Sequence, residues 1–292
     1  MDSGGTKCEL MIADESLKPI IYKKFKSIHY SVAGAEIIST EFSKLIKTVL
    51  KEKNLNLNYC KGICIGLAGA REDNDRRILK TKFSKKLGFK KIRIETDTMT
   101  GLYGAIGSGN GIILISGTGS VLFGKYNNKF YRTGGWGRIL GDEGSGYWIG
   151  KMGLNYAVKE FDLQKKNKSE FTKKLKLRFG LDGKNILEEV FHKNFPVQHI
   201  APLVIELSSK DIRCKEIVNE AINALYELIE TFIKISGMNK KTDLAFIGSI
   251  IESENLLSDL LKKKIKKKFK NINQITKRNI PVYGAILLAK EL

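Results

Sequence analysis

A carboxylate follows directly on a short strand-like segment near the middle of the sequence. Ile92 and Ile94 alternate with polar residues, the segment ends at Asp97, and small residues come next. This pattern predicts a β-strand over 92–96 and a short helix over 102–106. A carboxylate at a strand end can act as the general base that takes a proton from an attacking hydroxyl, although it can also cap the following helix. We favour the general base.

A glycine-rich turn separates two apolar runs shortly after this carboxylate. The runs are 112–115 and 121–123, and the sequence between them contains Ser-Gly-Thr-Gly-Ser. We expect a strand, a tight turn and a second strand. Glycines tolerate positive φ and let backbone N–H groups approach an anion closely, and the hydroxyls add donors. Taken alone, the motif fits a phosphate-binding turn and an ordinary hairpin equally well.

A similar motif lies at the start of the sequence. Asp-Ser-Gly-Gly-Thr-Lys at 2–7 precedes the apolar run 10–13. Two glycine–hydroxyl turns about a hundred residues apart suggest a duplicated unit. Two such turns in facing domains could bind a polyphosphate between them. Only Met1 precedes Asp2, so we expect the first strand to be short.

A third glycine-rich segment, GGWGRILGDEGSG, spans 134–146. Its glycine density predicts a shaped loop, and the sequence resumes as a predicted helix over 146–161. Trp136 is flanked by glycines, which offer an aromatic ring little to pack against. We therefore expect Trp136 to form the wall of a pocket rather than to fill the core.

These motifs together resemble a known family. DSGGTK, ETD, ISGTGS, GGWG and GDEGSGYWIG, in this order, are similar to the BadF/BadG/BcrA/BcrD-type ATPase family, in its N-acetylglucosamine kinase-like branch within the actin, sugar-kinase and Hsp70 superfamily. The motifs cover residues 1–150, with a weaker continuation at 245–249. The resemblance implies ATP-dependent phosphorylation of an amino sugar, N-acetylglucosamine or N-acetylmuramic acid, at the 6-OH.

The resemblance also implies roles for individual residues. Asp97 matches the catalytic carboxylate, and Asp2 matches the residue that organises Mg²⁺, through water because Mg²⁺ dehydrates reluctantly. The residues expected at ATP and its phosphates are Gly4, Gly5, Thr6, Lys7, Gly117, Thr118, Gly119, Ala221, Gly248 and Ser249. Those expected at the sugar are His29, Ser120, Gly135, Trp136, Gly137, Arg138 and Asp142.

Two positions depart from the family pattern. His29 stands where some relatives have a sugar-binding asparagine, and Val121 follows GTGS where the animal enzyme has asparagine. Val121 leaves apolar space and Arg138 offers a cation, which favours an acetylated sugar, with or without a lactyl group, over free glucosamine. Arg138 could instead pair with Asp142 or Glu143.

The order of predicted elements indicates an α/β fold. Strand, strand, helix, strand, helix, strand in the first third is the ribonuclease-H-like order. We expect two ribonuclease-H-like domains of the actin/hexokinase type with a cleft between them. The N-terminal one spans 1–108 and is completed by a C-terminal helix at 281–292. The C-terminal one spans 109–280, with a helical insertion at about 162–210, a long helix at 212–235 and a strand at 244–249.

Composition limits the other classes of function. The 292 residues carry 51 basic and 31 acidic side chains, a net charge of +20, but only nine of the 51 are arginine. The densest run, Lys262–Lys270, has apolar residues at helical spacing, which predicts a helix with a solvated lysine face. We therefore expect no nucleic-acid partner. No apolar run is long enough for a membrane span, so we expect no membrane partner. The resemblance implies a homodimer.

Four cysteines, without a CxxC pair or zinc spacing, indicate a reduced, cytoplasmic setting. Four alternatives remain open at this point. The chain could be a glucosamine kinase, or an ATPase activator of a 2-hydroxyacyl-CoA dehydratase, which holds an iron–sulfur cluster through closely placed cysteines. Cys60 and Cys64 lack the glycine-cysteine loop expected of such ligands. The chain could also be a sugar-responsive repressor, which would need a DNA-binding domain before the first turn, or a nucleotide-binding module without catalysis.

Overall fold

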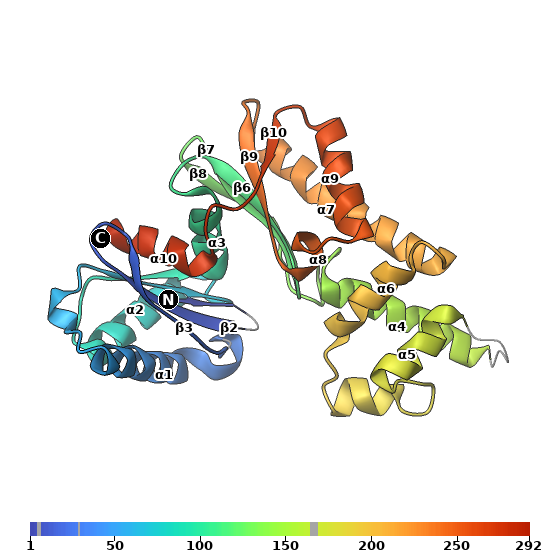
Figure 1. The fold of residues 1–292 in the computed structure, drawn as a ribbon, viewed down its shortest axis with the longest axis horizontal. Coiled ribbons are helices and arrows are strands. Elements are labelled where there is room, and N and C mark those ends of the chain that lie inside the picture. The colour runs from blue at the N-terminus through green and yellow to red at the C-terminus, as the bar shows by residue number, and fades with distance from the viewer. Residues whose placement is uncertain (5–6, 29, 164–168) are drawn as a thin grey trace. The chain divides into compact units, whose positions relative to one another are not determined.

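The computed structural model describes residues 1–4, 7–28, 30–163 and 169–292. The chain forms two compact units (Figure 1). Unit 1 comprises Met1–Gly109 and Thr276–Leu292, and unit 2 comprises Asn110–Ile275. The predicted domain boundaries stay a prediction: one domain of 1–108 completed by 281–292, and a second of 109–280.

Unit 1 is built on a five-stranded sheet. Its strands are β1 Asp2–Ser3, β2 Lys7–Ala13, β3 Pro19–Lys26, β4 Ile63–Leu67 and β5 Ile92–Thr96. They lie in the order β3-β2-β1-β4-β5. The strands β3, β2 and β1 are antiparallel, whereas β1, β4 and β5 are parallel. The carboxyl ends of β1 and β5 therefore lie at the same edge of the sheet.

Helices cover both faces of this sheet (Figure 1). One face packs against α1 Tyr30–Glu52, which bends at Gly34, and α2 Asp73–Leu87, in a core that includes Phe42 and Phe83. The 3₁₀ turn Leu57–Tyr59 follows α1. The other face packs against α3 Asp97–Ile106 and α10 Pro281–Lys290. The backbones of α3 and α10 meet closely, because a Cβ on Gly284 would lie 2.0 Å from the carbonyl oxygen of Thr100.

Unit 2 repeats the sheet topology of unit 1. Its strands are β6 Gly111–Ser116, β7 Ser120–Tyr126, β8 Lys129–Gly134, β9 Thr242–Ile247 and β10 Ile272–Ile275, in the order β10-β9-β6-β7-β8. Again the first three strands are antiparallel and the last two run parallel to the first. The duplicated unit suggested by the two glycine turns is confirmed at the level of strand order.

The helices of unit 2 follow the predicted order. They are α4 Gly146–Asp162, α5 Glu170–Phe179, the π turn Glu188–His192, the 3₁₀ turn Val197–Ile200, α6 Ala201–Leu207, α7 Ile212–Ser236, α8 Ser249–Glu252 and α9 Leu256–Lys268. The described part of the insertion at 162–210 contains α5, α6 and the two short helical turns, joined by loops. On α9, Leu257, Leu261 and Ile265 are buried while most of the lysines are exposed, as their spacing predicts. No helix within the described residues is both long and apolar enough to span a membrane.

Candidate active site

Asp97 lies at the junction of β5 and α3 in unit 1. It is the first residue of α3, but the residue that caps this helix is Thr96, whose hydroxyl oxygen accepts a hydrogen bond from the backbone N–H of Met99 at 3.2 Å. The carboxylate of Asp97 is therefore not the cap. Its side chain starts from the N-terminus of α3, where the helix dipole is positive.

A second carboxylate, Asp2, lies beside this junction. The hydroxyl of Thr100 donates to Asp2 Oδ1 at 2.5 Å and also lies 2.9 Å from the carbonyl oxygen of Asp97. Gly66 on β4 is opposite Asp2, and a Cβ there would lie 2.6 Å from Thr100 Cγ2 and 3.0 Å from Asp2 Oδ1. Glycine at 66 thus leaves room for Thr100 to reach the carboxylate of Asp2.

The environment of Asp2 disfavours its charged form. The side chain is buried, and this desolvation raises the pKa of Asp2 to about 7, with a further increase from the negative charge of Asp97 and an opposing effect of the Thr100 hydrogen bond. A nearby cation would reverse this effect. Mg²⁺ keeps most of its waters and needs only one or two carboxylates, so Asp2 with Asp97 suits it. Among the described residues no cluster of three or more His, Cys, Asp or Glu side chains forms a metal site.

The first glycine turn is described only in part. Gly5, Thr6 and His29 lie outside the described residues. The N–H of Gly4 donates to the carbonyl oxygen of Lys7 at 3.0 Å. The ammonium group of Lys7 pairs with the buried Glu9 at 2.9 Å, and Glu9 also accepts a hydrogen bond from Tyr22. Glu9 thereby restrains a lysine that is otherwise half exposed.

In unit 2 the second glycine turn joins β6 to β7 and contacts the loop 135–145. The two serines that flank it hold this loop, because Ser116 donates to the carbonyl oxygen of Gly144 at 2.9 Å and Ser120 donates to that of Glu143 at 2.7 Å. Thr118 lies exposed at the tip of the turn, and Gly117 accepts from the N–H of Gly146 at 2.7 Å. The described hydrogen bonds thus give both serine hydroxyls a role in loop position.

Asp142 connects the loop to the turn. Its Oδ1 accepts from the N–H of Gly137 at 3.3 Å, and a Cβ on Gly119 would lie 2.7 Å from its Oδ2. Asp142 has a positive φ of 61°, unusual for a residue with a side chain. Partial burial raises its pKa above the ordinary value, while hydrogen bonds from backbone N–H groups act against this. A carboxylate at this point can accept hydrogen bonds from a ligand's hydroxyls.

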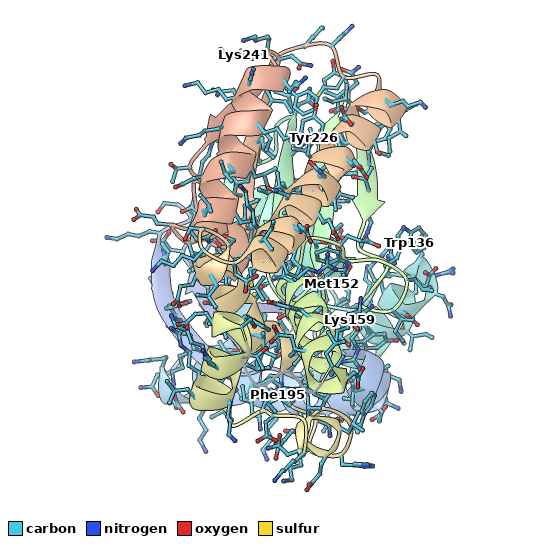
Figure 2. All side chains as sticks on the ribbon, turned by 90° about the vertical axis from the view of Figure 1, so that its right-hand side faces the viewer. Trp136, Met152, Lys159, Phe195, Tyr226 and Lys241 are labelled. Carbon is cyan, nitrogen blue, oxygen red and sulfur yellow. The ribbon has the colours of Figure 1, made fainter. Side chains whose placement is uncertain are left out.

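The rest of the loop projects outward from unit 2. Trp136, labelled in Figure 2, is 65% exposed and does not fill the core, and its role as a pocket wall stays a prediction. The guanidinium of Arg138 lies over the ring of Tyr147, 5.5 Å from the centroid. Gly135 starts the loop with a φ of 69° and accepts a hydrogen bond from Arg132 at 3.0 Å.

The β9–α8 turn packs against the β6–β7 turn. Gly248 has a φ of 110°, and a Cβ there would lie 2.4 Å from the carbonyl oxygen of Ser116. The N–H of Ser249 lies 3.8 Å from the position of a Cβ on Gly117. Ala221 is fully buried on α7, and its carbonyl oxygen lies 2.8 Å from where a Cβ on Gly144 would be. The residues of unit 2 that were predicted to bind the nucleotide therefore lie around the β6–β7 turn, whereas Ala221 packs against Gly144 in the loop 135–145.

Two residues of the site were not identified from the sequence. Thr100 contacts the carboxylate of Asp2 and the backbone carbonyl oxygen of Asp97. Arg132 holds the start of the loop 135–145 through the carbonyl oxygens of Gly134 and Gly135. Neither belongs to a motif. Cys64 is buried, which raises the pKa of its thiol to about 12, and the thiol of Cys60 donates to the carbonyl oxygen of Gly62 at 3.3 Å.

Comparison with known proteins gives a consistent result. A model of the BadF/BadG/BcrA/BcrD ATPase family matches residues 1–289. The chain is 30% identical to an N-acetylmuramic acid/N-acetylglucosamine kinase of Clostridium acetobutylicum, over 99% of this chain and 97% of that protein. It is also 30% identical to an N-acetyl-D-glucosamine kinase of Dictyostelium discoideum, over 99% and 96% of the two chains.

A crystal structure of a protein from Chromobacterium violaceum has a TM-score of 0.77 to this chain at 21% identity, covering 98% of this chain and 96% of the other. At that identity the likeness concerns the fold alone. Together with the two sheets of equal topology, it confirms the expected α/β class with two ribonuclease-H-like units.

Proposed function

Because this chain belongs to the BadF/BadG/BcrA/BcrD ATPase family, we propose that it transfers the γ-phosphoryl group of ATP to a hydroxyl of an amino sugar. The observation that carries the proposal is a pair of neighbouring carboxylates in unit 1, Asp2 within β1 and Asp97 directly after β5, whose charge acts on Asp2. Thr100 donates to the carboxylate of Asp2 and contacts the backbone carbonyl oxygen of Asp97. Such a pair supplies a base for the acceptor hydroxyl and a carboxylate for a phosphate-bound cation.

The proposed reaction needs few covalent steps from the protein. Asp97 accepts the proton of the sugar hydroxyl as its oxygen bonds to the γ-phosphorus, and the bond from that phosphorus to the bridging oxygen of ADP breaks. Mg²⁺, held by Asp2 through water, would neutralise phosphate charge. The backbone of the two glycine turns, with Thr6, Lys7 and Thr118, binds the phosphates, and Gly248, Ser249 and Ala221 belong to the nucleotide side.

For the acceptor we propose N-acetylglucosamine or N-acetylmuramic acid, phosphorylated at the 6-OH. The names of the two 30% identical relatives support this choice. Asp142, held against the second turn, is proposed to bind sugar hydroxyls, with Ser120, Gly135, Gly137 and His29 as further sugar contacts. The exposed Trp136 is proposed to stack on the sugar ring, and Arg138 to face a lactyl carboxylate where one is present.

The decisive experiment is a coupled ADP-release assay with N-acetylglucosamine, N-acetylmuramic acid, glucosamine and glucose, each with Mg²⁺ and with EDTA. We expect Mg²⁺-dependent turnover with the acetylated sugars and the phosphate on O6 by NMR. Preference for free glucosamine would overturn the choice of acceptor and leave the kinase in place. ATP hydrolysis that no sugar accelerates would overturn the kinase itself.

A cytoplasmic location, assembly as a homodimer, and the absence of nucleic-acid and membrane partners are further proposals. The family resemblance supports the homodimer, and the spread of lysines along the whole chain supports the absence of a nucleic-acid site. Light scattering on the purified protein tests the dimer, and a filter-binding assay with duplex and single-stranded DNA tests the second point.

A further inference from the structure

Glu9 on β2 is a buried carboxylate to which the proposed reaction gives no role. Its side chain is 1% exposed, and burying an ionised carboxylate is costly unless its charge is paired. The other buried carboxylates among the described residues are Asp2, which belongs to the site, and Glu160, which accepts hydrogen bonds from the N-cap residue of α5. Glu9 instead pairs with Lys7 and Tyr22.

Glu9 lies on the face of the sheet that carries Asp2. Side chains alternate between the two faces of a strand, and Cys8 and Leu10 belong to the core beneath α1 and α2. Lys7 and Glu9 are therefore on the other face. Asp2 is directly opposite Glu9 on β1, and residues opposite each other share a face. Burial is the main cause of the raised pKa of Asp2, and the negative charge of Glu9 adds to it, so the two carboxylates are close.

The carboxylate of Glu9 is shared between two partners. Tyr22 on β3, the strand beside β2 (Figure 1), donates its hydroxyl to Oε1. The ammonium of Lys7 lies 2.9 Å from Oε2, and no other donor among the described residues reaches that oxygen. Tyr22 thereby fixes the rotation of the carboxylate, which leaves Oε2 for Lys7.

Lys7 is restrained by Glu9 and still accessible to a ligand. Its side chain is 53% exposed, whereas that of Glu9 is 1% exposed. A lysine ammonium has three N–H donors, so a hydrogen bond to Glu9 leaves two for a ligand. A lysine side chain loses rotamer freedom when it binds an anion, and a contact made beforehand reduces that loss.

We propose that Glu9 is a positioning residue, which directs the ammonium of Lys7 at the phosphates of ATP with the help of Tyr22. This inference rests on the proposed function, in which Lys7 binds those phosphates. Glu9 acts through Lys7 and not by contact with ATP or the sugar. Because its negative charge offsets that of Lys7, the pair gives the phosphate contact a fixed direction rather than a net charge.

The variant Glu9→Gln tests this role with little change in shape. Glutamine can still accept a hydrogen bond from Tyr22, but it loses the ionic contact with Lys7. We expect kcat to fall by about tenfold or more, because displacing a binding group by about 1 Å is enough for such a loss. The KM for ATP should stay the same or fall, because the positive charge of Lys7 is no longer offset.

Dependence on Lys7 separates positioning from a general structural effect. Lys7→Met alone should lower kcat/KM for ATP by about tenfold or more, because a charged contact with the phosphates is lost. In the Lys7→Met protein, Glu9→Gln should cause no further loss of activity, because no ammonium is left to position. It should raise the Tm of that protein, because it removes a buried charge that has lost its partner.

Tyr22→Phe is a second test that leaves Glu9 in place. It removes one hydrogen bond to the carboxylate, so kcat should fall by about two- to tenfold, and only when Lys7 is present. Glu52→Gln is the matched control, since it removes a carboxylate that pairs with a different lysine, Lys23 on β3. Its kcat and KM should equal those of the wild type.

Two results would overturn the positioning role. One is a kcat of Glu9→Gln within about twofold of the wild-type value. The other is an equal loss from Glu9→Gln with and without Lys7. Wild-type ATP hydrolysis that no sugar accelerates would instead overturn the proposed kinase. The same variants would then be compared by their rates of ATP hydrolysis, because Lys7 contacts ATP whatever the acceptor.

Discussion

At the scale of single residues, Asp97 should affect turnover and not the fold. Thr96 caps α3, so Asp97→Asn leaves the side-chain cap of this helix in place. We expect kcat to fall by about 10²- to 10⁴-fold, the usual contribution of a general base. The Tm and the Kd for ATP should stay near their wild-type values. Glu72→Gln, at an exposed helix start in the same unit, is the matched control. Near-normal turnover of Asp97→Asn would exclude it as the base.

Gly66 should be intolerant of even a methyl group. Its Cβ would lie 2.6 Å from Thr100 Cγ2, so Gly66→Ala must displace Thr100 from Asp2. We expect a loss of about 1–3 kcal/mol in the free energy of unfolding, the usual cost of overpacking, measured by urea titration. Gly109→Ala is the control, since nothing lies within 4 Å of a Cβ at Gly109. Equal stability of the two variants would contradict the packing described around Asp2.

Asp142 should make stability depend on pH. Partial burial raises its folded-state pKa above the ordinary 3.8. Below that value the carboxyl is protonated in folded and unfolded chains alike, and as the pH rises through the folded-state pKa, ionising the partly buried group costs stability. Asp142→Asn avoids this cost. Its Tm relative to wild type should therefore increase as the pH rises above 3.8 and level off above the folded-state pKa. A difference that is constant across this range would refute the assignment.

The sequence located some site residues and could not locate others. Asp97, Asp142 and Gly248 could be proposed because each belongs to a motif whose spacing carries information, and their roles stay predictions. Thr100 and Arg132 were missed because a threonine within a helix and an arginine on a strand are common, and their importance lies in contacts with distant segments. Such contacts arise only when strands from separate parts of the chain are paired.

At the scale of elements, apolar periodicity predicted most strands and helices. The predicted strand 92–96 corresponds to β5, and the predicted long helix 212–235 corresponds to α7. Buried residues recur at every second position at the start of β5 and at helical spacing in α7. The short β10 was missed, because Ile-Asn-Gln-Ile is too brief and polar to signal a strand without its parallel partner β9. The bend of α1 at Gly34 likewise depends on a φ of 73° that composition alone does not require.

Two helices of the insertion are joined by an ionic contact that should also respond to pH. Glu206 on α6 accepts hydrogen bonds from Arg178 and Lys174 on α5, and these lower the pKa of Glu206 to about 2. A depressed carboxylate contributes stability above its ordinary pKa of 4.5 and loses that contribution as the pH falls towards 2. Glu206→Gln should therefore lower the Tm slightly at neutral pH. The difference from wild type should disappear near pH 2 and shrink in high salt. A pH-independent difference would show that the contact is not ionic.

At the scale of the whole molecule, the repeat of one strand order is the main organising fact. Both units place an antiparallel hairpin beside two parallel strands, and both place a glycine turn after the central strand. The two glycine–hydroxyl motifs in the sequence predicted this repeat.

The net charge of +20 should raise the rate at which the protein captures anionic substrates and leave that of neutral substrates unchanged. A positive surface raises the encounter rate with anions, and salt screens this effect. Raising NaCl from about 20 mM to about 300 mM should therefore lower kcat/KM for ATP several-fold with little change in kcat.

The neutral N-acetylglucosamine provides an internal control, because its kcat/KM at saturating ATP should not change. N-acetylmuramic acid carries a lactyl carboxylate, so its kcat/KM should fall with salt as that of ATP does. An equal response of the two sugars would mean that local contacts, rather than the field of the whole molecule, govern their capture.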